Sequence, residues 1–173
     1  MVSASIGNST VSRPLKVVGR GIEREVLKVG KGTVTDKHTS DFWVFEGVDG
    51  RDYAVTGTWG ADGTSFFWDV TDPTSIKKID SVKVDARTVN DVKVSQDGRI
   101  SVISREGASN RKNGIIILDV SNPYDVKILS EYTKNLTGGV HNVFIDNNHV
   151  YALSGSQRYY IINIEDPKNP VEV

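Results

Sequence analysis

One phrase occurs three times along the chain, and it limits the possible fold more than any other feature. It consists of an apolar run, an acidic or amide residue, a proline and a second apolar run, and it reads WDVTDPTSIKKI at 68–79, LDVSNPYDVKIL at 118–129 and INIEDPKNPVEV at 162–173. The prolines of the three copies lie about 50 and then about 44 residues apart, a spacing typical of the four-stranded blades of a β-propeller. A leucine-rich repeat would be much shorter.

Each repeat unit divides into four short strands. The first two are separated by a pair of residues that tolerates positive φ in a tight hairpin, and these pairs are Asp49-Gly50, Asp97-Gly98 and Asn147-Asn148. The third strands are nearly continuous apolar runs, as expected when both faces are covered, and they lie at 65–70, 114–120 and 159–164. The fourth strand alternates apolar and polar residues, which indicates a half-solvated outer strand.

No segment has a helical apolar period with caps, so we predict an all-β chain of blades with four antiparallel strands each. The three blades are expected at about 38–85, 86–135 and 136–173, which together form a β-propeller segment over 38–173. An N-terminal arm, 1–37, precedes them and contains a candidate extra outer strand, SRPLKVVG, at 12–19.

Three blades are too few for a closed ring, since propellers close with about four to eight. We therefore expect an incomplete ring in this chain. Three explanations stay open: the chain is part of a longer propeller, it assembles with copies of itself, or it forms an open array. In the first two cases the remaining blades, or self-association, close the ring.

The blades resemble the LVIVD-repeat β-propeller family, which is named after a third strand that ends in Val-Asp before a turn containing proline. The resemblance lies in GIIILDVSNPYDVKIL and YYIINIEDPKNPVEV with the hairpins before them, and the first unit is also similar to the N-terminal blade of the related choice-of-anchor B surface proteins. The chain departs from the pattern at Asn163, where the other units have Asp, and in the aromatic SFFWDV. The resemblance implies an extracellular or cell-surface location.

Composition excludes several classes of partner. The net charge of −1 and the isoelectric point of about 6.3 offer no basic footprint for nucleic acid. No apolar run approaches the roughly 18 residues of a membrane-spanning helix, so we expect no membrane insertion. The chain has no cysteine, which excludes disulfides and thiolate ligands.

Two columns of polar residues stand where the first strand of each blade begins. In a propeller this strand is innermost, so the side chains would ring the mouth of the central channel. Carboxylate, amide and imidazole groups there could hold a divalent cation or orient a ligand. Alternatively, they bond backbone groups at the blade junctions. The candidate ligand-binding residues are Ser40, Asn90 and His141 in one column and Asp41, Asp91 and Asn142 in the next.

A third row, formed by Asp69, Asp119 and Asn163, ends the third strand of every blade. A repeated position of this kind is expected to be structural, with each side chain bonding the turn of its own blade.

The segment 105–114, REGASNRKNG, is predicted to be a flexible surface loop. Its basic residues could meet an acidic partner or simply be solvated, and these residues are Arg105, Arg111 and Lys112.

No nucleophile or metalloprotease motif is present, and no catalytic residue is assigned. The repeats therefore favour a non-enzymatic binding or scaffold module whose partner is a protein or a glycan. The alternative is a metal-dependent propeller hydrolase of the lactonase or esterase type. It requires a divalent cation held at the channel mouth by the two polar columns.

Overall fold

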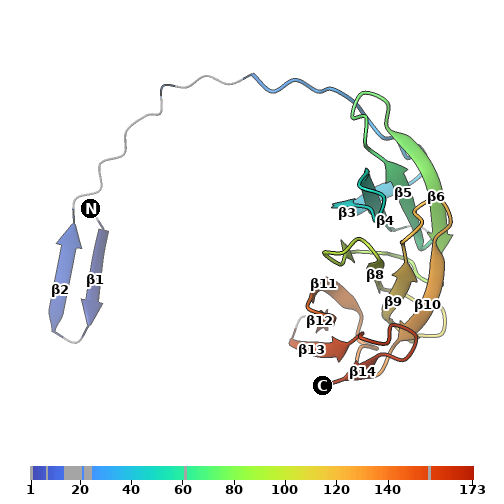
Figure 1. The fold of residues 1–173 in the computed structure, drawn as a ribbon. Helices are drawn as coiled ribbons and strands as arrows, with labels where there is room; N and C mark the ends of the chain where they lie inside the picture. The colour runs from blue at the N-terminus through green and yellow to red at the C-terminus, as the bar shows by residue number, and fades with distance from the viewer. Residues whose placement is uncertain (1, 7, 14–20, 22–24, 61, 156) are drawn as a thin grey trace.

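The computed structural model describes residues 2–6, 8–13, 21, 25–60, 62–155 and 157–173 (Figure 1). Within these residues there is no helix, and the repeats form three four-stranded antiparallel sheets, none of which closes into a barrel. The predicted all-β fold of four-stranded blades is therefore confirmed.

In every sheet the strands follow one another in chain order. The first blade contains β3 (His38–Glu46), β4 (Asp52–Trp59), β5 (Thr64–Asp69) and β6 (Lys77–Lys83). The second contains β7 (Val92–Val94), β8 (Ile100–Arg105), β9 (Gly114–Asp119) and β10 (Lys127–Tyr132). The third contains β11 (Val140–Asp146), β12 (His149–Ser154), β13 (Arg158–Asn163) and β14 (Val171–Glu172).

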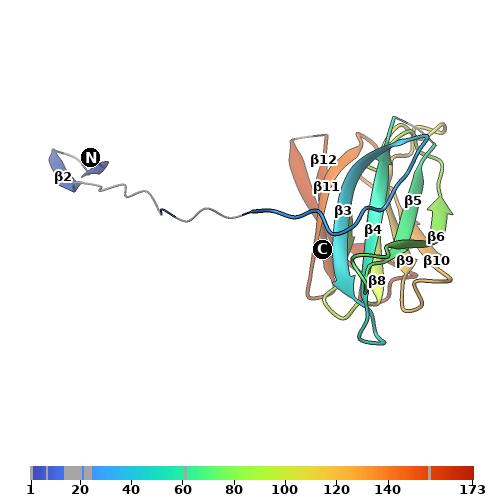
Figure 2. The ribbon, with the colours of Figure 1, turned by 90° about the horizontal axis from the view of Figure 1, so that it is seen from above.

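The three blades succeed one another as a fan, with the first strands on the inner side and β6, β10 and β14 on the outer side (Figures 1 and 2). The inner strand β7 contacts both β3 and β11. The ends of the inner strands from all three blades therefore meet around one region of the molecule.

The hairpins between first and second strands confirm the predicted turn signals. Gly50 and Gly98 have φ of +76° and +70°, and each amide donates to the carbonyl three residues earlier, at 2.9 Å in both turns. In the third blade Asn147 and Asn148 carry the positive φ, at +44° and +59°. Two such residues between directly paired strand ends form the two-residue turn that suits a twisted hairpin.

The row at the end of the third strands behaves as predicted. The side-chain oxygen of Asp69, Asp119 and Asn163 accepts a hydrogen bond from the backbone amide two residues later, at 3.1, 2.9 and 2.8 Å. The residue before each proline repeats this bond at 2.9, 3.2 and 3.1 Å. Local side-chain bonds therefore shape the repeated turn, which explains why the phrase recurs.

Two apolar cores lie between the blades. One joins the first and second blades around Phe67, Val55 and Ile116, and the other joins the second and third around Ile117 and Ile162. All of these side chains are fully buried. The strand β9 contributes alternate residues to both cores, as its continuous apolar sequence predicted.

The expected N-terminal arm contains a hairpin of β1 (Val2–Ile6) and β2 (Ser9–Arg13), in which Val2 pairs with Arg13. The extra outer strand expected at 12–19 falls largely on residues 14–20, outside the described residues. Its two described residues, Ser12 and Arg13, pair with β1.

Residues 25–37, which we call the strap, run to the start of β3, and from Gly30 onward they cross the face of the first blade that is turned away from the second blade. Val34 packs against a cluster of Ala54, Phe66 and Trp68. The strap backbone approaches so closely at Gly30 that an added Cβ would lie 1.8 Å from the carbonyl oxygen of Pro73. The blade thus buries this apolar face under its own chain.

Among the described residues there is no helix with the length and hydrophobicity that a membrane crossing requires.

Candidate functional site

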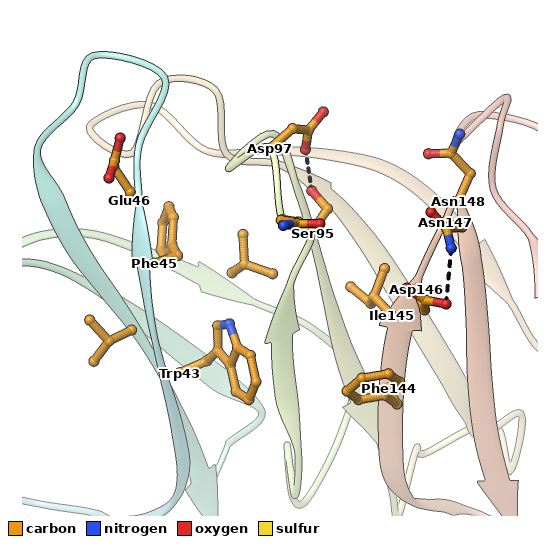
Figure 3. A pocket seen from close by; sticks show the side chains of 13 residues that line it. Trp43, Phe45, Glu46, Ser95, Asp97, Phe144, Ile145, Asp146, Asn147 and Asn148 are labelled. Atoms are coloured by element: carbon orange, nitrogen blue, oxygen red, sulfur yellow. Dashed lines mark hydrogen bonds between the residues drawn. The ribbon is translucent and has the colours of Figure 1, made fainter.

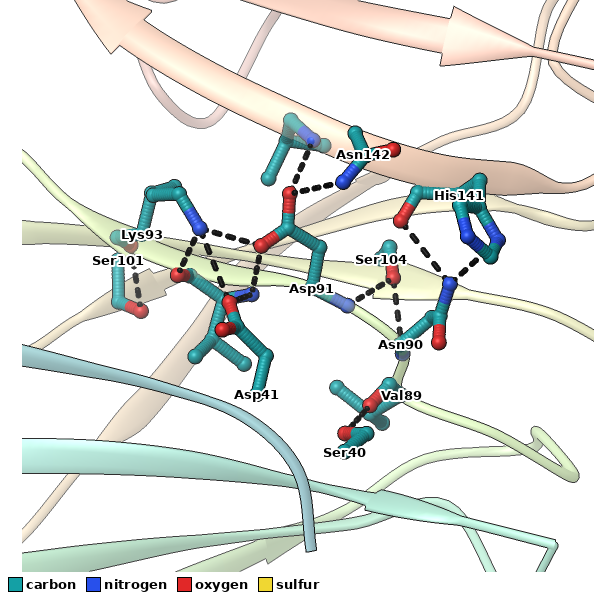
Figure 4. Close-up of polar contacts among 12 residues, drawn as sticks. Ser40, Asp41, Val89, Asn90, Asp91, Lys93, Ser101, Ser104, His141 and Asn142 are labelled. Atoms are coloured by element: carbon teal, nitrogen blue, oxygen red, sulfur yellow. Dashed lines mark hydrogen bonds and ion pairs between the residues drawn. The ribbon is translucent and has the colours of Figure 1, made fainter. Parts of the chain in front are cut away.

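Both predicted polar columns lie at the junctions between the inner strands (Figure 4). Ser40 and Asp41 belong to β3, and His141 and Asn142 belong to β11. Asn90 and Asp91 directly precede β7 in the second blade, and Figure 4 draws their contacts with residues of their own and the third blade.

The first column links each blade to the next through a backbone carbonyl. Ser40 Oγ donates to the carbonyl oxygen of Val89 at 2.5 Å, and Asn90 Nδ2 donates to that of His141 at 3.1 Å. Asn90 Nδ2 also lies 2.5 Å from His141 Nδ1, which accepts when that nitrogen is unprotonated. The same column therefore bonds a backbone carbonyl of the next blade at both junctions, although the acceptor residues differ by one position in the repeat.

The second column links the blades through a backbone amide. Asp41 Oδ2 accepts from the amide of Val92 at 3.2 Å, and Asp91 Oδ2 accepts from the amide of Val143 at 2.6 Å. Each carboxylate thus bonds the backbone of the neighbouring inner strand. We call these two bonds, together with the two carbonyl bonds of the first column, the blade staples.

Lys93 joins the two carboxylates of the second column. Its Nζ lies 2.9 Å from Asp41 Oδ2 and also pairs with Asp91 Oδ1. The ammonium stands 5.0 Å from the ring centre of Trp43, within the range of a cation–π contact. With 15% of the Lys93 side chain exposed, the group is largely removed from water.

Burial and the charges of neighbouring groups both shift the pKa values of Lys93 and Asp91. Burial works to lower the pKa of Lys93, but the carboxylates of Asp91 and Asp41 outweigh it and the pKa is raised. Burial, reinforced by the neighbouring Asp41 carboxyl, raises the pKa of Asp91. The ammonium therefore stays protonated at neutral pH and compensates the carboxylate charge.

The chemistry of this cluster fits an internal ion pair better than a metal site. The ammonium occupies the position between Asp41 and Asp91 where a cation would bind. His141 instead contacts Asn90 and lies 3.7 Å from Glu106 Oε1. Over the described part of the chain, no group of three or more His, Asp or Glu side chains is placed to hold a metal ion.

Asn142 is the last member of the second column and makes only a marginal contact. Its Nδ2 lies 3.5 Å from Asp91 Oδ2, and the residue is exposed. His141 is exposed as well. In the first two blades the column residues bond backbone at the inner strand of the next blade. Among the described residues no inner strand follows the third blade, so His141 and Asn142 have no such strand to bond.

Sequence reasoning missed a groove between the hairpin ends of the inner strands (Figure 3). It has a volume of about 600 Å³, and its lining comes from β3, β11 and the ends of their hairpins, with residues 94–97 from the second blade. The apolar part contains Trp43, Phe45 and Phe144. The sequence offered only the aromatic residues of β3 and β11 as a signal, because only the fold brings these segments together.

Arg105 does not belong to a solvated loop. It ends β8 with 2% of its surface exposed, and its Nη1 donates to Glu131 Oε2 at 2.8 Å. Its Nη2 bonds the carbonyl oxygen of Lys112. Arg105 is therefore a structural residue of the second blade, whereas Arg111 and Lys112 are exposed.

A scan against models of protein families finds no match to this chain, and a search of curated proteins finds no relative. The likeness to LVIVD repeats therefore stays a resemblance carried by the repeated phrase and its hairpins.

Proposed function

We propose that the chain is a non-enzymatic binding and scaffold module, part of an LVIVD-like β-propeller displayed outside the cell or on its surface. Its partner is a protein or a glycan, and further blades or copies of the chain close the ring. The observation that carries the proposal is that the carboxylates of the second polar column bond groups of the protein itself. Asp41 and Asp91 are engaged by backbone amides and by Lys93, so they hold blades together instead of presenting a reactive constellation.

The face of the third blade that is turned away from the second blade supports the scaffold part of the proposal. Tyr159 is 67% exposed, and Leu153 and Ile161 on the same face are half-buried. At both existing junctions the equivalent faces are covered by a neighbouring blade. Apolar surface of this kind marks an interaction site when it is contiguous.

Hydrolysis and metal binding test this proposal against the hydrolase alternative. The purified chain is assayed for lactone and ester hydrolysis with calcium or zinc and after EDTA treatment, while thermal unfolding and native mass spectrometry are recorded on the same samples. We expect no turnover and no shift of the unfolding midpoint, because an ion bound to the folded state would raise it. EDTA-sensitive hydrolysis that Asp91→Asn abolishes, in a variant shown to be folded, would contradict the proposal.

Binding is measured separately on immobilised chain with arrays of glycans and of synthetic peptides. Saturable binding to either class supports the module. A chain that unfolds cooperatively, and so is folded, but binds no member of either array counts against it.

A further inference from the structure

We infer that the groove between the inner hairpins binds a basic side chain, a lysine or arginine presented by a peptide or protein partner. This inference rests on the proposed binding function and names the class of partner that the groove recognises. It differs from the blade staples, because none of the six predicted site residues lines the groove.

The groove combines an apolar part with an acidic rim. Figure 3 shows Trp43 and Phe144 at one end, Glu46 and Asp97 at the other, and Asp146 on the side of Phe144. Phe144 is 55% exposed, so its ring is open to a ligand. An aromatic face near carboxylates is an arrangement that attracts organic cations.

The charge of the groove is one-sided. The three carboxylates contribute negative charge, and no Lys, Arg or His stands among the described residues that line the groove. Asp97 accepts from Ser95 Oγ at 2.6 Å, and Asp146 accepts from Asn147 Nδ2 at 3.1 Å. Two cations stand beside the lining: Arg99, an exposed side chain, has its Nε 3.8 Å from Asp97 Oδ2, and the Lys93 ammonium lies 5.0 Å from the ring centre of Trp43 and is paired with Asp41 and Asp91. A basic ligand would therefore complement the groove.

The protein already binds one of its own ammonium groups by the same combination. Lys93 lies over the ring of Trp43 and pairs with two carboxylates. Phe144 holds the position in β11 that Trp43 holds in β3, and acidic Asp146 lies two residues beyond it. The groove thus also combines an aromatic ring with carboxylates, although Asp146 does not hold the place of Asp41, whose equivalent in β11 is Asn142.

A guanidinium suits the groove better than an ammonium. Its planar fork bonds a carboxylate with two parallel hydrogen bonds and its face stacks on an aromatic ring. A neutral sugar could also stack on Phe144 and bond Asn147 and Asn148, but it would leave the three carboxylates uncompensated. Binding of a sugar is therefore treated as a contrary outcome.

The test uses the full chain and fluorescence anisotropy with labelled hexa-arginine, hexalysine and hexaglutamate peptides, each at low and at physiological ionic strength. We expect saturable binding of hexa-arginine, weaker binding of hexalysine and none of hexaglutamate. Glu46→Gln and Asp146→Asn are each expected to weaken hexa-arginine binding about fivefold to tenfold. Phe144→Ala is expected to weaken it about threefold to tenfold.

Matched control variants distinguish binding of the peptide in the groove from non-specific attraction between charges. Glu165→Gln removes an exposed carboxylate elsewhere, and Phe42→Ala removes an aromatic side chain of β3 that is 65% exposed and does not line the groove. Both should stay within about twofold of the unmodified chain. Thermal unfolding of every variant establishes that it is folded before binding is compared.

Three results would overturn the inference: no hexa-arginine binding, equal loss in the control variants, or displacement of the peptide by a neutral oligosaccharide. If the chain binds a glycan or peptide and the groove variants leave that binding unchanged, the inference fails while the proposed module stands. EDTA-sensitive hydrolysis would instead remove the proposed function itself.

Discussion

The first and third blades share one sequence pattern, but their faces turned away from the second blade have different surroundings. In the first blade the strap covers this face, and all six residues of β5 are buried. In the third blade the face turned away from the second blade is open, and the one buried residue of β13, Ile162, packs toward the second blade. Burial of a blade residue is therefore set by what packs beside its blade and not by its place in the repeat.

Equivalent positions on the face that meets the next blade along the chain show the same dependence on what packs beside a blade. Phe67, Ile117 and Ile161 occupy the same place in the three repeats. Phe67 and Ile117 are fully buried, whereas Ile161 is partly exposed. The comparison teaches that the same apolar side chain stabilises the fold in one blade and forms a surface in the other.

The largest expected effect comes from truncating this position in two blades. Ile117→Ala should lower the free energy of unfolding by about 2–5 kcal/mol, because it leaves a cavity in a closed core. Ile161→Ala should cost less than about 1.5 kcal/mol, since its surroundings are already partly solvent. Urea denaturation of both variants measures the difference.

Equal losses for the two variants would contradict the comparison. They would indicate that the face of the third blade is covered in solution, by a copy of the chain or by another sheet. Repeating the Ile161→Ala measurement over a range of protein concentrations identifies a covering copy, because association makes the measured stability depend on concentration.

A second, smaller effect is expected when the strap is displaced from the first blade. Gly30→Ala places a methyl group against the Pro73 carbonyl, where an added Cβ would lie 1.8 Å from the oxygen. Relieving this clash should cost about 1–3 kcal/mol. It should also expose Trp68, which is 6% exposed, and red-shift the tryptophan emission.

Lys31→Ala is the matched control in the strap, because Lys31 is exposed beside Gly30. Its stability and emission should stay close to those of the unmodified chain. If Gly30→Ala behaves like this control, the strap does not cover the blade as described.

The smallest expected effect concerns the end of the third strand. Burial works to raise the pKa of Asp69, but hydrogen bonds from Thr71 and Tyr124 together with the charge of Arg51 outweigh it and the pKa is lowered. The stabilisation from the carboxylate is therefore present above the unfolded-state pKa of about 3.9 and is lost as pH falls through the lower folded-state value. Asp69→Asn should cost about 1 kcal/mol at pH 7, and the cost should shrink below about pH 4.

The reverse substitution, Asn163→Asp, at the equivalent position of the third blade is the control for this prediction. Arg51 Nη2 lies 2.5 Å from Asp69 Oδ2, whereas no basic side chain among the described residues makes such a contact with Asn163. Asn163→Asp should therefore change stability by less than about 0.5 kcal/mol. Urea denaturation between pH 2.5 and pH 7 follows both variants, and a pH-independent loss for Asp69→Asn would be evidence against the charged contact.

The sequence predicted the features that depend on neighbouring residues. Turn residues such as Gly50 and Asn147 determine local backbone geometry, and the bond from Asp119 spans two residues, so both are visible in a short window. The polar columns were also found from the repeat, and bonding of backbone at blade junctions was one of the two interpretations given. Their contacts agree with that interpretation at both junctions.

Features that depend on distant segments were not predictable in the same way. Nothing in the strap distinguishes Val34 as a core residue, because its partners on β4 and β5 lie about 20 to 34 residues later and follow no shared period with it. Lys93 appears in sequence as an ordinary strand residue between two valines. Its contact with Asp41 joins residues of different blades, and only the packing of β7 beside β3 reveals it.

The blade staples also determine how stability is distributed along the chain. The bonds of Ser40 and Asp41 to backbone groups run to the second blade, and those of Asn90 and Asp91 run to the third. Each junction thus couples nearest neighbours, as in a linear array where unfolding can begin at an end and advance one unit at a time. The strap restrains one terminus of that array, so progressive opening would start at the third blade and move toward the first.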